Sequence, residues 1–256
     1  DIYTVDMVSE DHYRNKTNMG AMNPDKFWNL VSNGYHFQYM YNSMQLNQGN
    51  GLFSEIAHML GIAQTDWSFA ALFADFDNDG NKDIFITNGM LRDVRNKDIE
   101  IKKKEIFEKM AKENIHKLAQ SSLTKFLDIL PSEPIRNYLY KNTGNLGFQN
   151  VTTKWNLNEK SFSQGAAYGD LDNDGDLDLV VNNLNQPAFV YENLNQGNYI
   201  NIKLLGSNFN TKSIGARAVL YSNNKLQMCE MTNVRGYMST SELSIHFGLG
   251  ASNKVD

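Results

Sequence analysis

Short apolar runs, either alternating with polar residues or continuous, dominate the pattern of the chain. Apolar and polar residues alternate in RNYLYKN (residues 136–142) and AFVYEN (188–193), and Asn and Gly follow each run. This alternation is typical of half-exposed β-strands that end in turns. The continuous runs IFI and LDLVV indicate strands that are buried on both faces. The pattern therefore predicts a turn-rich, mainly β protein.

Two segments depart from this β pattern and predict helices. NPDKFWNLVSNG has Asn23 as a cap, Pro24 in the first turn and Gly34 after the last turn. A longer segment, about residues 90–134, places apolar residues at three- and four-residue steps opposite Lys and Glu, and Pro131 ends it. We interpret it as a helical insertion with a solvated Lys-rich face; a face that docks a partner is the alternative. Its apolar stripe consists of Ile106, Phe107, Met110, Ala111, Ile115 and Leu118.

A repeated acidic phrase divides the β segments into units. DFDNDGNKDIFITNG starts at Asp75 and DLDNDGDLDLVVNN at Asp170, an offset of 170 − 75 = 95 residues. An aromatic residue, a Ser and small Ala or Gly residues precede both phrases, and the opening DIYTVD matches their ends. About three units result, the first of them truncated. Look-alike units of this kind indicate a repeat architecture, here a partial β-propeller with four-stranded blades.

The pattern changes after about residue 195. NYINIKLLG, IGARAVLYSNN, KLQMCEMTN and ELSIHFGLG are four strand-like pieces, and no acidic phrase occurs among them. We therefore predict two domains. Residues 1–195 would form the propeller blades, with the helical insertion at about 90–134, and residues 196–256 a small, incomplete β domain.

The acidic phrase has the spacing of a cation loop. D-x-D-x-D-G-x-x-D places carboxylates at positions 1, 3, 5 and 9, a turn-forming Gly at position 6 and a backbone carbonyl at position 7, which is the ligand pattern of a calcium loop. In the first loop the predicted ligands are Asp75, Asp77, Asp79, the carbonyl of Asn81, and Asp83. In the second loop they are Asp170, Asp172, Asp174, the carbonyl of Asp176, and Asp178.

The loops differ from an EF-hand at position 12. A bidentate Glu is required there, but the residues are Ile86 and Val181, and each loop leads into a strand. Oxygen-only ligands in a loose loop favour Ca²⁺ over the smaller Mg²⁺. The ligands are all local, so we expect the ion to be structural. Asp1 is a candidate for the ninth position of a third loop.

Composition and motifs exclude several function classes. The net charge of −5 and pI of about 5.6 argue against nucleic-acid binding, which needs a basic face. The single cysteine, Cys229, makes no internal disulfide, and no apolar stretch approaches ~18 residues, so we expect no membrane span in this chain. The five histidines lie outside metalloprotease spacing, and no nucleophile motif occurs. We therefore expect no enzyme.

The acidic phrases and the residues before them resemble the FG-GAP/VCBS repeats of integrin-α-like β-propellers. The residues that carry the resemblance are 68–71 with 75–83, and 163–167 with 170–178. SIGARAVLY (213–221) and RGYMSTSELSIHFGLG (235–250) are similar to the ASPIC/UnbV domain of the cartilage acidic protein family and its bacterial relatives.

This resemblance implies a seven-bladed propeller with Ca²⁺ in the blade loops, exported and usually at a cell surface, and it implies no reaction. Three units cannot close a propeller, so we expect the chain to be part of a larger polypeptide. The C-terminal domain also stops at NKVD, before the final strand and the Trp-Pro element that the family shows.

The function predicted from the sequence is a non-catalytic, calcium-stabilised binding or scaffold module for a protein or a glycan, secreted or at the cell surface. The alternative is a polysaccharide-active lyase or hydrolase with its active site outside this fragment. Aromatic residues alternate from Tyr35 to Tyr41 at strand spacing. We predict that they pack in the core and across strands; a platform that stacks on sugars is the alternative.

Overall fold

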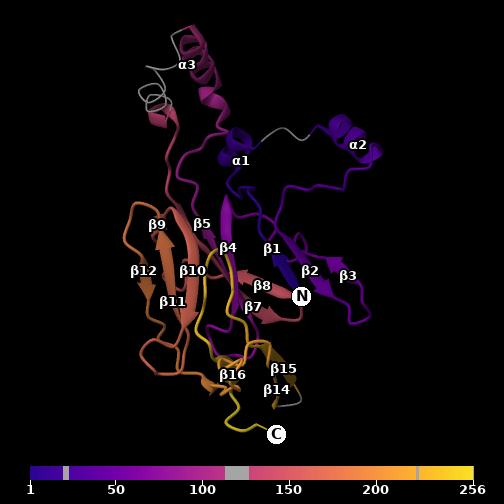
Figure 1. Ribbon diagram of the computed structural model, residues 1–256, viewed down its shortest axis with the longest axis vertical. Coiled ribbons are helices and arrows are strands. Elements are labelled where there is room, and N and C mark those ends of the chain that lie inside the picture. The colour runs from indigo at the N-terminus through magenta and orange to yellow at the C-terminus, as the bar shows by residue number, and fades with distance from the viewer. Residues whose placement is uncertain (20–22, 113–126, 223–224, 256) are drawn as a thin grey trace.

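Three small antiparallel sheets follow one another along the chain (Figure 1). The computed structural model describes residues 1–19, 23–112, 127–222 and 225–255. We call the sheets the first, second and third blade. The first has the order β1 (Ile2–Thr4), β2 (Ser43–Asn47), β3 (Phe53–Glu55). The second has the order β4 (Ser68–Ala74), β5 (Asp83–Asn88), β7 (Tyr138–Gly144), β8 (Gly147–Asn150), and the third β10 (Ser163–Gly169), β11 (Asp178–Asn183), β12 (Phe189–Tyr191).

One recurring hydrogen bond shows that the blades are copies of one unit. The backbone N–H of Asn142 donates to Asp83 Oδ1 at 2.8 Å, and that of Asn193 donates to Asp178 Oδ1 at 2.9 Å. In the first blade the N–H of Asn47 donates to Asp1 Oδ1 at 2.8 Å. The mainly β, partial-propeller fold predicted from the repeats is thus confirmed, and this bond places Asp1 at the ninth position of the phrase.

The predicted four strands per blade hold only for the second blade. The first and third blades have three strands each within the described residues. In the third blade the reason is visible, because the segment that follows β12 pairs elsewhere. It forms β13 (Asn198–Ile202), which pairs with β16 (Ile245–Gly250) of the C-terminal unit.

The helices are inserted at the same point of two blades. The spacing between the paired Asp and Asn is 193 − 178 = 15 residues in the third blade, 142 − 83 = 59 in the second and 47 − 1 = 46 in the first. The extra residues in the first blade include α1 (His12–Asn18) and α2 (Pro24–Ser32), and those in the second include η1 (Lys97–Ile99) and α3 (Glu100–Lys112). Residues 113–126 of the predicted insertion lie outside the described residues. Figure 1 shows α1, α2 and α3 together at one end of the blades.

The apolar core lies between neighbouring blades. Ile84 and Ile86 of β5 are fully buried and pack toward Met44 in the first blade, whereas Phe85 packs toward Val181 in the third. Successive strand residues point to opposite faces, so a strand with blades on both sides must be apolar throughout. The continuous run IFI predicted this burial correctly.

A short pair of strands joins the second and third blades at their helical end. These strands are β6 (Ile135–Arg136) and β9 (Lys160–Ser161), and they pair in antiparallel fashion. Among the helices in the described part of the chain, none has the length and apolarity that crossing a membrane requires.

The C-terminal unit lies at the opposite end from the helices (Figure 1). The four predicted strand pieces contain its four strands, since β14 (Arg217–Ser222) and β15 (Lys225–Glu230) form a hairpin beside the β13–β16 pair. Its core consists of Leu220, Met231, Ile245 and Phe247. The unit therefore has an apolar core of its own.

The aromatic run after α2 leaves the core except at its last residue. Tyr41 packs against the core of the first blade, as predicted, but the prediction is wrong for the aromatic residues before it. Residues 35–40 form no strand, and the side chains of Phe37 and Tyr39 are 57% and 51% exposed. The predicted helix is present, with Asn23 as its cap, but none of its residues is buried. The rings instead pack on the apolar side of that helix, where the centroids of Phe27 and Tyr39 are 5.6 Å apart.

Candidate metal centre

Both acidic phrases fold into the same turn between two adjacent strands of a blade. The fourth and sixth loop positions have a left-handed backbone in each copy, with φ of 55° at Asn78 and 87° at Gly80, and 65° at Asn173 and 95° at Gly175. Asn and Gly are the residues that adopt this conformation at least cost. The DNDG sequence thus turns the aspartates on either side of it toward one another.

The first loop gathers three of its predicted ligands. Carboxylate oxygens of Asp75, Asp77 and Asp83 all lie within 4.8 Å of one another. The carboxylate of Asp75 accepts hydrogen bonds from the N–H groups of Asp79 and Gly80, at 3.0 and 2.9 Å. These bonds hold the turn closed around the cluster.

Asp79 and Asn81 lie beside that cluster. Asp79 Oδ1 accepts from the backbone and side-chain amide of Asn81, at 2.8 and 2.9 Å. Lys141 forms ion pairs with Asp77 and with Asp79 Oδ2, the latter at 3.1 Å. The first loop therefore already has one protein cation against it.

The second loop is more open and more acidic. Oxygens of Asp170, Asp172 and Asp174 lie within 4.8 Å of one another, and the last two residues are exposed. Asp178 is buried outside this cluster, where its carboxylate accepts from the N–H groups of Leu171 and Asn193, at 2.8 and 2.9 Å. Asp176, predicted to contribute its carbonyl, also buries its carboxylate.

Several buried carboxylate oxygens have no hydrogen-bond partner among the residues that the structure describes. They are Asp77 Oδ1, Asp170 Oδ1 and both oxygens of Asp176. A buried polar atom without a partner costs roughly 1–3 kcal/mol, and more when it is charged. A cation in each loop would satisfy the oxygens of Asp77 and Asp170, which belong to the two clusters, and an all-oxygen donor set suits a hard divalent ion. The residues present therefore fit a metal ion.

Burial makes several of these acids hard to ionise while the loops hold no cation. It raises the pKa of Asp75 to about 6 and the pKa of Asp83 to about 8, although backbone N–H groups offset part of the rise. In the second loop burial, together with the neighbouring carboxylate of Asp174, raises the pKa of Asp176 to about 7. A bound cation would reverse this effect.

Asn78 connects the first loop to two other parts of the molecule. Its side-chain oxygen accepts from Nε2 of His246 in β16 at 2.6 Å, and its amide donates to the Gly175 carbonyl of the second loop at 3.3 Å. Because that oxygen is an acceptor, Nε2 of the histidine carries the proton. The N–H of Gly250 donates to the Asn78 carbonyl at 2.7 Å, and a Cβ at Gly248 would collide with the Asp75 carboxylate.

Two protein-family models match parts of the chain. A model of FG-GAP-like repeats matches residues 22–86 and 126–181, and a model of the ASPIC and UnbV domain matches residues 206–256. The chain carries FG-GAP-like repeats followed by an ASPIC/UnbV domain. The resemblance inferred from the acidic phrases and from SIGARAVLY is thus confirmed. A search of curated proteins found no match.

Two residues that contact other parts of the molecule at the first loop were not singled out by the sequence pattern. Asn78 joins the first loop to the ASPIC/UnbV domain, and Lys141 pairs with two aspartates of that loop. One signal was available, because Tyr140-Lys-Asn142 and Tyr191-Glu-Asn193 share the form YxN. This form marks the Asn that bonds the ninth aspartate, and it shows that Lys141 in one repeat corresponds to Glu192 in the next.

This exchange predicts unequal affinities in the two FG-GAP loops. Replacing Lys141 by Met should tighten cation binding by the first loop about tenfold, because it removes a competing ammonium group. Calorimetric titration with Ca²⁺ measures the change. Lys154→Met, which removes a lysine that forms no ion pair within the described residues, is the matched control. Unchanged affinity in the Lys141 variant would show that the ion pair does not compete.

The free energy of unfolding in EDTA should fall as the pH rises from 6.5 to 8. Asp83 and Asp176 have folded pKa values of about 8 and 7, above the ordinary value of 3.8, so the folded chain binds more protons than the unfolded chain in this range. Burial lowers the folded pKa of His246 to about 4, so this residue opposes the trend chiefly below about pH 7, where the unfolded imidazole is still partly protonated.

Urea unfolding at several pH values checks this dependence. We expect a slope of about 1 kcal/mol per pH unit in EDTA. Millimolar Ca²⁺ should abolish the slope, because the ion keeps the carboxylates ionised at every pH tested. A flat curve in EDTA would show that these aspartates ionise as freely in the folded chain as in the unfolded one.

Replacing Asn78 by Gly should loosen the ASPIC/UnbV domain from the repeats. Gly keeps the left-handed backbone, so the variant removes only the bonds to His246 and Gly175, at a cost of about 1–3 kcal/mol. Hydrogen exchange in β16 should become faster. Asn173→Gly is the matched control, because this residue has the same loop position and backbone and an exposed side chain. Equal exchange in both variants would argue against the connection.

Proposed function

We propose that this chain is a non-catalytic binding or scaffold module that Ca²⁺ stabilises and that works outside the cytoplasm, secreted or at a cell surface. FG-GAP-like repeats followed by an ASPIC/UnbV domain support a binding or scaffold role. The observation that carries the calcium part is the set of buried carboxylate oxygens without partners in both loops.

The residues that would hold the ions are those that converge in each loop. They are Asp75, Asp77 and Asp83 in the first loop, and Asp170, Asp172 and Asp174 in the second. Bound Ca²⁺ would supply positive charge that offsets the repulsion among these carboxylates.

The chain's own contacts explain how such a site would act on the scaffold. The hydrogen bonds from Asp79 and Gly80 to Asp75 fix the turn. The hydrogen bonds of Asn78 to His246 and to Gly175 then fix the positions of β16 and of the second loop relative to this turn. Filled loops would therefore make the blades and the C-terminal unit one rigid body.

The affinity expected of such loops supports the proposed location. Sites of the extracellular kind bind Ca²⁺ at roughly 10⁻⁴ to 10⁻³ M. The second loop has exposed ligands, and the first has a lysine against it. Both features favour this weak range, in which the loops would fill where Ca²⁺ is millimolar and stay empty in cytoplasm.

The partner would be a protein or a glycan that docks on the rigid scaffold. The test is to screen the immobilised protein against glycans and surface proteins, in Ca²⁺ and in EDTA, while assaying every glycan for cleavage. We expect binding that Ca²⁺ strengthens, without turnover. Cleavage of any glycan would replace the scaffold role by the enzymatic alternative, and binding equal in Ca²⁺ and EDTA would remove the calcium part.

A further inference from the structure

We propose that the groove between the second and third blades is a binding site for a neutral glycan. This inference rests on the proposed function, since it names the ligand class and the place on the scaffold where the ligand binds. The groove has a volume of about 780 Å³, within the range of about 300–1,000 Å³ that is usual for ligand sites.

The groove exists because the third blade lacks an outer strand. Asn142 and Asn193 are equivalent residues, because each bonds the ninth aspartate of its loop, and they are 193 − 142 = 51 residues apart. At this offset β8 (147–150) corresponds to residues 198–201, which belong to β13. Because β13 pairs with β16 in the C-terminal unit, no strand in the described part of the chain covers β12 on the side where β8 covers β7. The space beside β12 is left open.

The floor of the groove is apolar and carries aromatic rings. Leu139 and Leu179 of the two facing blades belong to the buried core beneath it, and the half-buried Trp155 and Tyr191 pack against the same core. The two aromatic side chains thus border a concave surface instead of filling a core. An aromatic ring with one face exposed to solvent can stack on ligands that have both apolar faces and polar edges.

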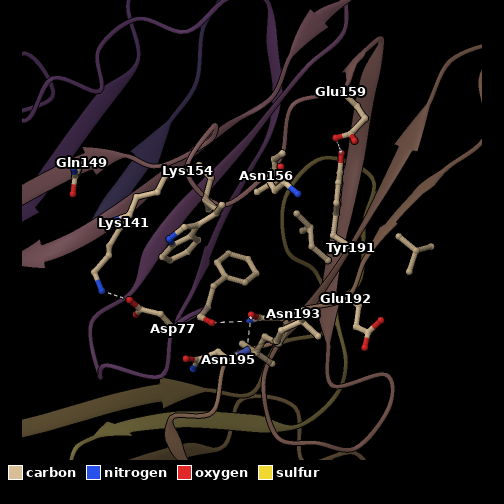
Figure 2. Close-up of a pocket in the computed structure, with 18 residues that line it drawn as sticks. Asp77, Lys141, Gln149, Lys154, Asn156, Glu159, Tyr191, Glu192, Asn193 and Asn195 are labelled. Atoms are coloured by element: carbon tan, nitrogen blue, oxygen red, sulfur yellow. Dashed lines mark hydrogen bonds and ion pairs between the residues drawn. The ribbon is translucent and has the colours of Figure 1, made fainter.

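Polar side chains line the walls from both blades. Figure 2 shows Lys141, Gln149 and Lys154 on one side of the groove, and Glu159, Tyr191 and Glu192 on the other. The Tyr191 hydroxyl donates to Glu159 at 3.2 Å, which fixes the ring.

Some of these groups remain free to bind a ligand. Within the described residues, the side chains of Gln149, Lys154 and Glu192 form no hydrogen bond or ion pair, and the buried Nδ2 of Asn195 has no partner either. The groove therefore offers donors and acceptors side by side, as a row of hydroxyl groups requires.

The balance of charge favours a neutral ligand. Lys141 is paired with Asp77 in the groove, so the remaining charges are Lys154 against Glu159 and Glu192. This near balance gives no cluster of positive charge for phosphate or sulfate groups. Sugars without charged groups present hydroxyls for the wall residues and apolar C–H faces for the rings. An extended peptide is the other occupant to test.

The test uses Trp155 as a reporter in the full chain. The chain has three tryptophans, so Trp28→Phe combined with Trp67→Phe leaves Trp155 as the only one. This variant is titrated, in Ca²⁺, with neutral hexasaccharides of glucose, xylose, mannose, galactose and N-acetylglucosamine. A sulfated oligosaccharide and a library of extended peptides are the contrasts. We expect a saturable change in fluorescence with at least one neutral hexasaccharide.

Variants of the groove then locate the site. Gln149→Ala combined with Lys154→Ala changes two exposed side chains without breaking a described bond and should weaken binding at least tenfold at an unchanged melting temperature. Trp28→Ala with Phe37→Ala, on the exposed aromatic surface of α2, should have no effect. Loss of binding only in the α2 variant would overturn the proposal. A fluorescence change with peptides but with none of the neutral sugars would overturn it as well, and so would no change with any ligand.

These outcomes separate the groove from the proposed function. Calcium-strengthened glycan binding that the groove variants leave unchanged would keep the scaffold role and remove this site. The absence of any glycan or protein partner, with no effect of Ca²⁺, would remove both.

Discussion

Removing Ca²⁺ from the folded protein is expected to lower its melting temperature by about 10 °C. When the free Ca²⁺ concentration is about 10–100 times the dissociation constant of a site, that site stabilises the native state by roughly 1.4–2.7 kcal/mol. Two sites together contribute about 3–5 kcal/mol, and each kcal/mol shifts the melting temperature of a chain of this size by about 2–4 °C. The unpartnered oxygens of Asp77 and Asp170 are the atoms on which this gain depends.

Thermal melts in Ca²⁺, in Mg²⁺ and in EDTA measure the effect. Asp172→Asn combined with Asp174→Asn should remove about half of the gain. Asn preserves the side-chain oxygens that accept from the N–H groups of Asp174 and Asp176 but removes the charge of the second loop. Mg²⁺ should stabilise less, because it demands a tighter octahedral geometry. Equal melting temperatures in Ca²⁺ and EDTA would show that the acidic loops need no cation.

Replacing Arg14 by Ala is expected to cost about 3–5 kcal/mol of unfolding free energy. The guanidinium of Arg14, on α1, is buried and donates from Nε and Nη2 to Asp66 at 2.7 and 3.1 Å, and from Nη1 to Asp93 at 3.1 Å and Glu133 at 3.2 Å. Asp66 and Asp93 are themselves buried. The substitution would therefore leave two buried carboxylates without their counter-ion.

Urea unfolding of the two proteins checks this cost. Arg217→Ala is the matched control, because the pair between Arg217 and Glu230 has a similar distance of 2.7 Å but is exposed, and exposed pairs contribute less than about 1 kcal/mol. Arg14→Lys should also be destabilising, since a point charge cannot replace the forked contacts. A loss below about 1 kcal/mol for Arg14→Ala would show that this buried network contributes no more to stability than an exposed ion pair.

Local signals in the sequence predicted the parts of the fold that depend on neighbouring residues. The cap at Asn23 and the proline after it predicted α2, and the continuous run from Ile84 to Ile86 predicted a strand buried on both faces. The two DNDG turns predicted loops of identical backbone, because the left-handed positions need Asn and Gly wherever the loop lies.

Features that depend on contacts between distant residues could not be predicted from the sequence. The sequence placed NYINIKLLG in the C-terminal β domain, where β13 lies, but it could not show that this strand pairs with β16 and so leaves the third blade with three strands in the described residues. The aromatic residues after α2 alternate like a strand, but their rings pack on that helix instead. The contact of Lys141 with the first loop joins residues 64 positions apart, so the spacing of the aspartates alone could not show that the two loops differ in charge.

The number of calcium ions bound by the folded chain is the most direct test of the proposal that both acidic loops are cation sites. Native mass spectrometry in millimolar Ca²⁺ should find two ions per chain, and one in the Asp172→Asn, Asp174→Asn variant. Two ions in the wild type would agree with the converging aspartates of both loops. A chain without bound calcium, or a variant that binds as many ions as the wild type, would contradict it.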